Sequence, residues 1–125
     1  MKPSPILIPA AALLFIGVVS LRLLAGGADP QTGKEVFARR CSGCHSLEVN
    51  KEGPRLRGVI SRKAGSVPAF PYSDALRKSG FIWDESRLDQ WLQNPGAFVR
   101  DTDMEFRVTN ADERAAVIAY LKSTP

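Results

Sequence analysis

The apolar positions of the chain form one continuous run at the N-terminus and short periodic stripes after it. Residues 3 to 21 carry no charge, and the hydrophobic part of this run is Ile6 to Leu21. Its length lies between the core of a signal peptide, about 7–15 residues, and a spanning helix, about 18–20 residues. Small residues follow at 25 to 28, where a signal peptidase would cleave. We therefore predict an export segment over 1–28, a cleaved signal peptide or a retained membrane anchor, and a separate domain over 29–125.

Two helices are predicted at the ends of this domain. Asp29-Pro30 supplies an N-cap followed by proline at the first helical position, which predicts a helix over "PQTGKEVFARR". Gly33 inside that helix costs about 1 kcal/mol relative to alanine, and a close helix crossing would be a reason to tolerate it. At the other end, Asn110 and Glu113 resemble a capping box before an apolar stripe in "ADERAAVIAYLKS".

Two further helical segments are predicted in the middle of the domain. In "SRLDQWLQNP", Leu88, Trp91 and Leu92 share one face, and Pro95 closes the helix. A shorter turn of helix is expected from Ser73 to Gly80. No segment shows the alternation of a half-buried strand, so we predict an all-α fold.

Long irregular stretches separate these helices, roughly over residues 46–72 and 96–109. Loops of this length in a compact domain are usually functional or disordered. These two contain few aliphatic residues, yet their composition differs from that of a disordered tail. We therefore expect a bound cofactor to organise them.

The charge excludes one class of function. The chain of 125 residues has 44% hydrophobic and 24% charged residues and a formal charge of +4, as in an ordinary soluble protein. Because Lys2 and Arg22 lie in the export segment, the net charge from Asp29 onward is +2. That domain is too weakly basic to indicate nucleic-acid binding.

The candidate chemistry lies in "CSGCH", which holds both cysteines, Cys41 and Cys44, and the only histidine, His45. A thioredoxin-like dithiol needs a strand-helix-strand context that is absent here. A structural zinc ion takes four protein ligands, and these residues provide three. A disulfide across so short a loop would stabilise little and would leave the histidine unexplained.

The spacing C-x-x-C-H is instead the attachment pattern of a covalent haem c. The two thiols add to the vinyl groups of the porphyrin, and His45 follows as an axial iron ligand. With one histidine in the chain, the second axial ligand is Met104, since Met1 is the initiator. Histidine and methionine raise the reduction potential. Two strong ligands leave no open position, which favours electron transfer.

The segment from Asp29 to Lys122 resembles class I cytochrome c of the mitochondrial type and its short bacterial relatives. The resemblance rests on "GKEVFARRCSGCHSL", "GPRLRGVISRKAG", "PAFPYSDAL", "IWDESRLDQWLQNP", "DMEF" and "ERAAVIAYLK", in the order of the family. It implies the cytochrome c fold, in which the first and last helices cross and short helices and long loops wrap round one haem. The crossing would lie near Gly33, Phe37, Val117 and Tyr120.

The resemblance also implies roles for residues around the haem. The carbonyl of Pro54 would accept the imidazole N–H of His45, which orients the ring. The positions that bind the haem propionates in the family are occupied by Arg62, Tyr72, Ser73 and Trp83. The positions that pack on the macrocycle are occupied by Leu56, Leu92 and Phe106.

Several residues depart from the family pattern. Trp91 stands where a tyrosine usually lies near the methionine sulfur, and an indole can donate a hydrogen bond but cannot accept one. Leu76 replaces an asparagine, which should make the pocket drier. The lysines around the methionine are replaced by Gly96, Ala97 and Asp103, while Arg39 and Arg40 keep positive charge near the expected haem edge. We expect docking to an acidic oxidase to be weaker and less sensitive to salt than in a lysine-ringed cytochrome.

These features predict a monomeric, one-haem electron carrier of the bacterial periplasm that performs no bond chemistry. Its electron donor would be a quinol-oxidising complex, and its acceptor a terminal oxidase, a reaction centre or a reductase. A membrane contact is expected only through an uncleaved N-terminal segment. The alternatives are a dedicated subunit of a periplasmic dehydrogenase, and a haem sensor or weak peroxidase with a labile Met104.

Overall fold

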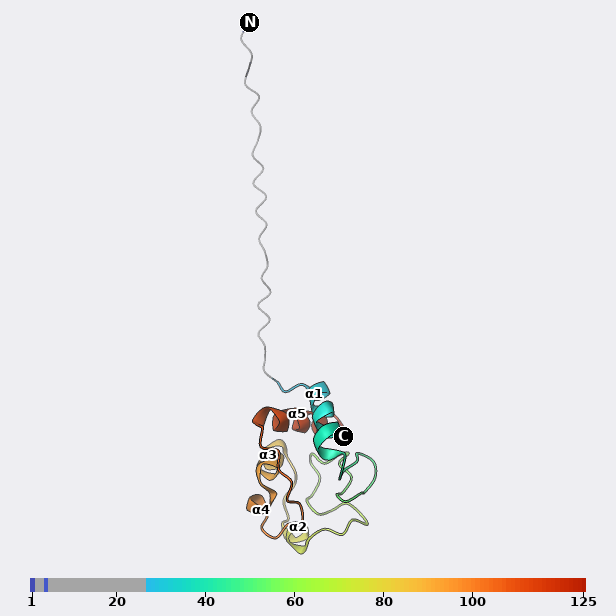
Figure 1. Cartoon of the computed structure of the whole chain (residues 1–125). Helices are drawn as coiled ribbons and strands as arrows, with labels where there is room; N and C mark the ends of the chain where they lie inside the picture. The colour runs from blue at the N-terminus through green and yellow to red at the C-terminus, as the bar shows by residue number, and fades with distance from the viewer. Residues whose placement is uncertain (2–3, 5–26) are drawn as a thin grey trace.

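The structure is a computed structural model that describes Met1, Ser4 and residues 27–125. Most of the predicted export segment, residues 1–28, lies outside the described residues; only Met1, Ser4, Gly27 and Ala28 belong to both. Helices and loops make up the described part, with one isolated antiparallel bridge between Lys63 and Ile82. No strand occurs in this part, so the all-α prediction is confirmed (Figure 1). The elements are α1 (Pro30–Val36), η1 (Phe37–Cys41), α2 (Asp74–Lys78), α3 (Glu85–Gln93), α4 (Pro95–Phe98) and α5 (Ala111–Lys122).

The first helix begins as its sequence predicts but ends differently. The carboxylate of Asp29 accepts hydrogen bonds from the backbone N–H groups of Gln31 at 3.0 Å and Thr32 at 3.1 Å. After α1 the chain continues as the π-helical turn η1, with a hydrogen bond from Ser42 N–H to the Phe37 carbonyl at 3.0 Å. The expected α-helix through residue 40 is therefore wrong in its last turn. Such widened turns occur often at functional sites, and this one ends at Cys41.

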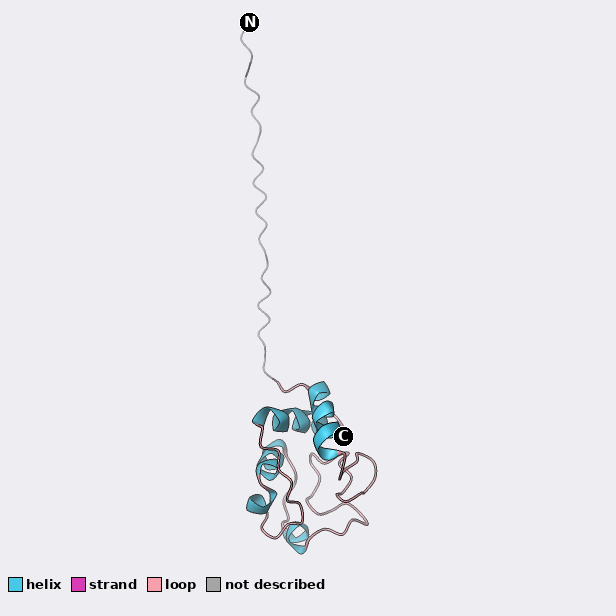
Figure 2. Ribbon diagram, viewed as in Figure 1, coloured by secondary structure: helices cyan, strands magenta, loops and turns pink. Residues whose placement is uncertain are grey.

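Helices α1 and α5 cross in close contact, as predicted (Figure 2). Gly33 is buried at the crossing, and a Cβ atom there would overlap the carbonyl oxygen of Ala116 and lie 2.7 Å from Tyr120 Cβ. The rings of Phe37 and Tyr120 meet edge to face, with their centroids 5.6 Å apart. Only glycine permits this approach, which explains its place inside a helix despite its low helix propensity.

Helix α3 buries Leu88, Trp91 and Leu92 on one face, as its periodicity predicts. It ends before Pro95, but Pro95 then occupies the first turn of a further short helix, α4, whose N-cap is Asn94. The Asn94 side chain accepts a hydrogen bond from Ala97 N–H at 3.2 Å. The expectation of an irregular chain from residue 96 is therefore wrong at its start, because Asn-Pro ends one helix and begins another.

Helix α5 has half of the expected capping box. The Asn110 side chain accepts from Glu113 N–H at 3.0 Å. The Glu113 carboxylate, however, pairs with Arg39 at 3.0 Å and Arg40 at 3.1 Å. These two arginines precede Cys41, so the pairs tie the segment that carries the CSGCH motif to α5. The positive charge expected from Arg39 and Arg40 is thus partly neutralised.

The long loop of residues 46–72 lies opposite α3 and α4 (Figure 2). Together with the helices it surrounds the interior of the domain. Among the residues that the structure describes, no helix is both long and apolar enough to cross a membrane.

Candidate functional site

One cavity of about 490 Å³ collects all of the residues that the sequence assigned to the site. Its lining comes from η1, α2, α3 and α5 and from the loops that connect the helices. The predicted residues in it are Cys41, Cys44, His45, Pro54, Leu56, Arg62, Tyr72, Ser73, Trp83, Trp91, Leu92, Met104 and Phe106. A second hollow, of about 670 Å³, lies between α3 and α5 and contains neither sulfur nor imidazole groups.

The ring of His45 is fixed through one nitrogen. Its Nδ1 lies 2.8 Å from the carbonyl oxygen of Pro54, the contact expected from the sequence. Because a carbonyl oxygen only accepts, Nδ1 must donate, and the lone pair of Nε2 is left for a metal. Gly53 packs against the same ring, and a Cβ there would lie 2.6 Å from Nε2.

Burial lowers the pKa of His45 below its usual 6.5, and the charge of Lys51 lowers it further, although the hydrogen bond to Pro54 opposes this. The ring is therefore held neutral, which is the form that binds a metal ion.

Cys41 is the last residue of η1, and Cys44 lies on the turn that follows. The N–H groups of Cys44 and His45 donate to the Cys41 carbonyl at 3.1 and 2.8 Å, which fixes the spacing of the three side chains. Both thiols are free. Burial, followed by the neighbouring Cys44, raises the pKa of the Cys41 thiol to about 11. Cys41 is thus a neutral thiol at the cavity wall.

The sulfur of Met104 accepts a hydrogen bond from a side chain of α3. Trp91 Nε1 donates to Met104 Sδ at 3.2 Å. The indole is itself fixed, because Trp91 is 7% exposed and packs edge to face on Trp83 with the ring centroids 5.4 Å apart. The donation expected of an indole at this position is present.

The family model described as "Cytochrome c" matches residues 30–125. The chain belongs to the cytochrome c family. The cytochrome c2 of Rhodomicrobium vannielii is 42% identical over 125 residues, covering 97% of this chain and 95% of that protein. The cytochrome c type-1 of Ascaris suum is 41% identical over 97 residues, covering 75% of this chain and 87% of that protein.

A solved structure gives the same result for the fold. Cytochrome cH from Methylobacterium extorquens aligns with a TM-score of 0.72 and 40% sequence identity, covering 77% of this chain and 99% of that one. The described part of this cytochrome c therefore has the cytochrome c fold, as predicted. Members of the family bind one covalent haem c through a cysteine pair, typically with histidine and methionine as axial ligands.

The cavity of this cytochrome c fits that cofactor. Two thiols, a neutral imidazole with one free nitrogen and a thioether line the same space. The thioether and imidazole are the axial donors that haem iron accepts in cytochromes c. Apolar side chains cover much of the remaining wall, including those of Leu56, Leu76 and Leu92.

The polar residues expected near the haem propionates also hold the loops together. The guanidinium of Arg62 donates to the carbonyls of Arg57 at 2.9 Å and Arg55 at 2.8 Å. The hydroxyl of Tyr72 accepts from Val67 N–H at 3.2 Å. Ser73 caps α2, accepting from the N–H of Leu76 at 3.2 Å. These three residues thus shape the cavity wall as well as lining it.

One functional cluster was missed by the sequence analysis. Arg114 of α5 is buried and pairs with Asp89 of α3, at 2.7 Å between Nε and Oδ1. The partners are 25 positions apart, so no local spacing relates them. The available signal in the sequence was an arginine in a helix whose other residues are largely apolar.

Proposed function

We propose that this cytochrome c is a monomeric one-electron carrier of the bacterial periplasm, linking a quinol-oxidising complex to an oxidase, a reaction centre or a reductase. The observation that carries the proposal is the pair of candidate axial donors in one cavity, each fixed by its own hydrogen bond. When bound, the haem supplies a one-electron iron couple. The protein's part is to keep both donors in place in either oxidation state.

Different residues would attach the haem and ligate its iron. Cys41 and Cys44 would form the thioether links, and His45 Nε2 and Met104 Sδ would ligate the iron. Two strong ligands leave no position for oxygen or peroxide. Because the indole of Trp91 holds the sulfur at 3.2 Å, the arrangement supports a carrier over a gas sensor.

Apolar walls around the iron exclude water and so favour the less charged, reduced state. Leu56, Leu76 and Leu92 would contribute this wall, together with Phe106. Arg62, Tyr72, Ser73 and Trp83 line the same cavity. We assign them to the propionates, where the guanidinium of Arg62 would offset negative charge.

The test is an optical spectrum of the haem-loaded protein, ferric and then reduced, in the native form and as Met104→Ala. We expect a sharp low-spin reduced spectrum and a weak ferric sulfur-to-iron band that disappears in Met104→Ala. The neighbouring Glu105→Gln should retain the band. A high-spin spectrum that Met104→Ala leaves unchanged, with carbon monoxide binding to the reduced protein at neutral pH, would instead support the sensor or peroxidase.

Export through residues 1–28 belongs to the same proposal. The family model begins at residue 30, which supports the division into an export segment and a haem domain over 29–125. Mass spectrometry of the exported protein tests it. A mature start near Ala28 or Asp29 means a cleaved signal peptide, whereas the full-length mass in the membrane fraction means an anchor.

A further inference from the structure

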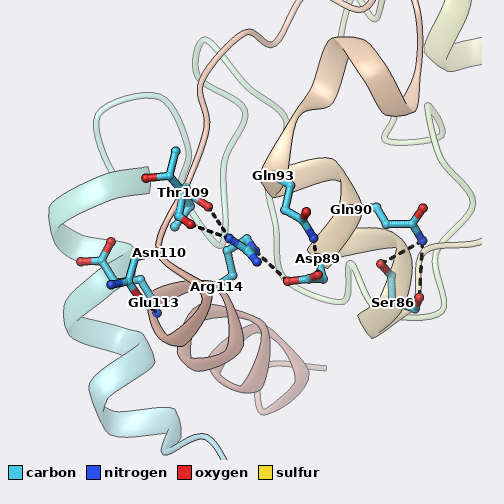
Figure 3. Close-up of polar contacts among 9 residues, drawn as sticks. Ser86, Asp89, Gln90, Gln93, Thr109, Asn110, Glu113 and Arg114 are labelled. Carbon is cyan, nitrogen blue, oxygen red and sulfur yellow. Dashed lines mark hydrogen bonds and ion pairs between the residues drawn. The ribbon is translucent and has the colours of Figure 1, made fainter.

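A buried arginine joins three segments of the domain at one point (Figure 3). Arg114 projects from α5, and its Nε donates to Asp89 Oδ1 of α3 at 2.7 Å. Its Nη1 donates to the carbonyls of Val108 at 3.0 Å and Thr109 at 2.9 Å. The side chain of Arg114 is 10% exposed and that of Asp89 is 40% exposed, so water has little access to the guanidinium end of these bonds.

Asp89 is in turn oriented by its own helix. Its second carboxylate oxygen accepts from Gln93 Nε2 at 2.6 Å (Figure 3). The carboxylate therefore presents Oδ1 to the arginine with both oxygens engaged. The planar guanidinium then meets a carboxylate on one side and two carbonyls on the other, a geometry that an ammonium group cannot reproduce.

The two carbonyls belong to the loop that carries Met104. Within the described residues, no backbone-to-backbone hydrogen bond involves positions 103 to 107. The loop is fixed beyond them, where Val108 N–H donates to the Leu92 carbonyl at 2.8 Å and Val108 is 2% exposed. The position of the methionine thus depends on the ends of the loop and on Trp91.

We propose that Arg114, oriented by Asp89, is a positioning residue for Met104: it holds the C-terminal end of the loop on α3 and so keeps the sulfur at the iron. This rests on Met104 being the axial ligand, as proposed above. Without the guanidinium, the buried carbonyl of Val108 and the partly buried carbonyl of Thr109 lose a charged donor. The loop then opens locally more often while the rest of the domain stays folded.

The experiment is an imidazole titration of the ferric, haem-loaded, full-length protein, followed by the loss of the sulfur-to-iron band. Imidazole replaces the methionine only when the loop is open, so its apparent affinity rises with the open population. The variants are Arg114→Gln, Arg114→Lys and Asp89→Asn. Val36→Ala serves as the control, because Val36 is 2% exposed on α1 and lies outside the cavity lining. Amide exchange at Val108 provides a second readout.

We expect Arg114→Gln to bind imidazole at least about tenfold more tightly, the factor that corresponds to one charge-assisted hydrogen bond. Arg114→Lys and Asp89→Asn should show smaller increases, and amide exchange at Val108 should accelerate in the same order. Val36→Ala should lower the unfolding midpoint and leave imidazole affinity unchanged.

The proposal is overturned if Arg114→Gln and the native protein bind imidazole alike, or if Val36→Ala raises the affinity as much at equal loss of global stability. Should Arg114→Gln fail to fold, Arg114→Lys and Asp89→Asn decide the matter by the same comparison. A native protein without the sulfur-to-iron band would instead contradict Met104 ligation itself, so the two failures are distinguishable.

Discussion

Trp91 Nε1 donates a hydrogen bond to Met104 Sδ across 3.2 Å. A thioether sulfur has two lone pairs, so it can accept this bond and still donate to iron. The bond withdraws electron density from the sulfur. With Met104 as the proposed iron ligand, a weaker donor would stabilise the ferric state less, and the indole would therefore favour the reduced state.

Replacing the indole should lower the reduction potential. We expect Trp91→Phe to lower it by a few tens of millivolts, because a hydrogen bond of about 1 kcal/mol corresponds to about 40 mV in a one-electron couple. Voltammetry of the haem-loaded protein measures this. Trp91→Tyr keeps a donor and should recover part of the shift, and an unchanged potential in Trp91→Phe would show that the bond does not tune the iron.

A methyl group at Gly53 should displace His45. A Cβ at this position would overlap the imidazole ring, lying 2.6 Å from Nε2, and the hydrogen bond between Nδ1 and the Pro54 carbonyl holds the ring in place. We expect Gly53→Ala to destabilise the haem-loaded protein by about 2 kcal/mol or more, as overpacking at a rigid site does. Chemical denaturation measures the loss.

Gly43→Ala is the matched control, because a Cβ at Gly43 has no neighbour within 4 Å. It lies in the same attachment segment and should change stability little. Equal effects of the two substitutions would show that the contact with His45 is not the cause.

The ion pairs of Glu113 with Arg39 and Arg40 should make the stability of the fold depend on pH in the acidic range. The hydrogen bond from Arg39, with the nearby Arg40, lowers the pKa of Glu113 below its usual 4.5. The contribution is therefore complete above 4.5 and is lost as the pH falls through the lower, folded-state value. Glu113→Gln should be less stable than the native protein at pH 7, and the difference should shrink below pH 4.5.

Thermal unfolding at a series of pH values from 7 to 3 measures this dependence. Glu35→Gln removes another exposed carboxylate, one with no ion pair in the described part of the chain, and should leave the curve unchanged. A difference between Glu113→Gln and the native protein that is constant over the whole range would contradict the assignment.

The charged residues around Met104 should determine how strongly the oxidation rate by a partner oxidase depends on salt. The loop carries Asp103, and Arg40 is paired with Glu113 at 3.1 Å. We expect the oxidation rate by an oxidase with an acidic docking face to fall only slowly with added salt. The variant with Gly96→Lys and Asp103→Lys should react faster at low salt and show a steeper fall. A steep fall in the native protein would contradict this expectation.

Local signals in the sequence were sufficient for most of the fold. Asp29 and Asn110 mark helix starts because capping involves residues only two or three positions away. The stripe of Leu88, Trp91 and Leu92 gave α3 because burial follows the helical period. The cavity residues were found because the attachment motif and the family resemblance fix their order.

Other features depend on contacts between distant segments and were not predictable. The carboxylate of Glu113 was expected to complete a capping box with Asn110. It pairs instead with Arg39, which is 74 positions away. The local sequence does not by itself mark Arg114 as buried, yet α3 and the end of the methionine loop enclose it. The widening of the first helix after Val36 also has no local marker in the sequence.

The π-helical turn η1 affects how many residues connect the helix crossing at Gly33 to the cysteine at the cavity. Gly33 packs closely on α5 at one end of this segment, and Cys41 lies at the cavity at the other end. The residues between them therefore connect two fixed positions. An α-helix rotates by about 100° for each residue, and the π-helical turn η1 accommodates one residue more than a regular turn. A deletion or an insertion of one residue here would swing Cys41 around the helix axis. The number of residues between Gly33 and Cys41 therefore fixes the direction in which Cys41 leaves the helix, in addition to the contacts that their side chains make.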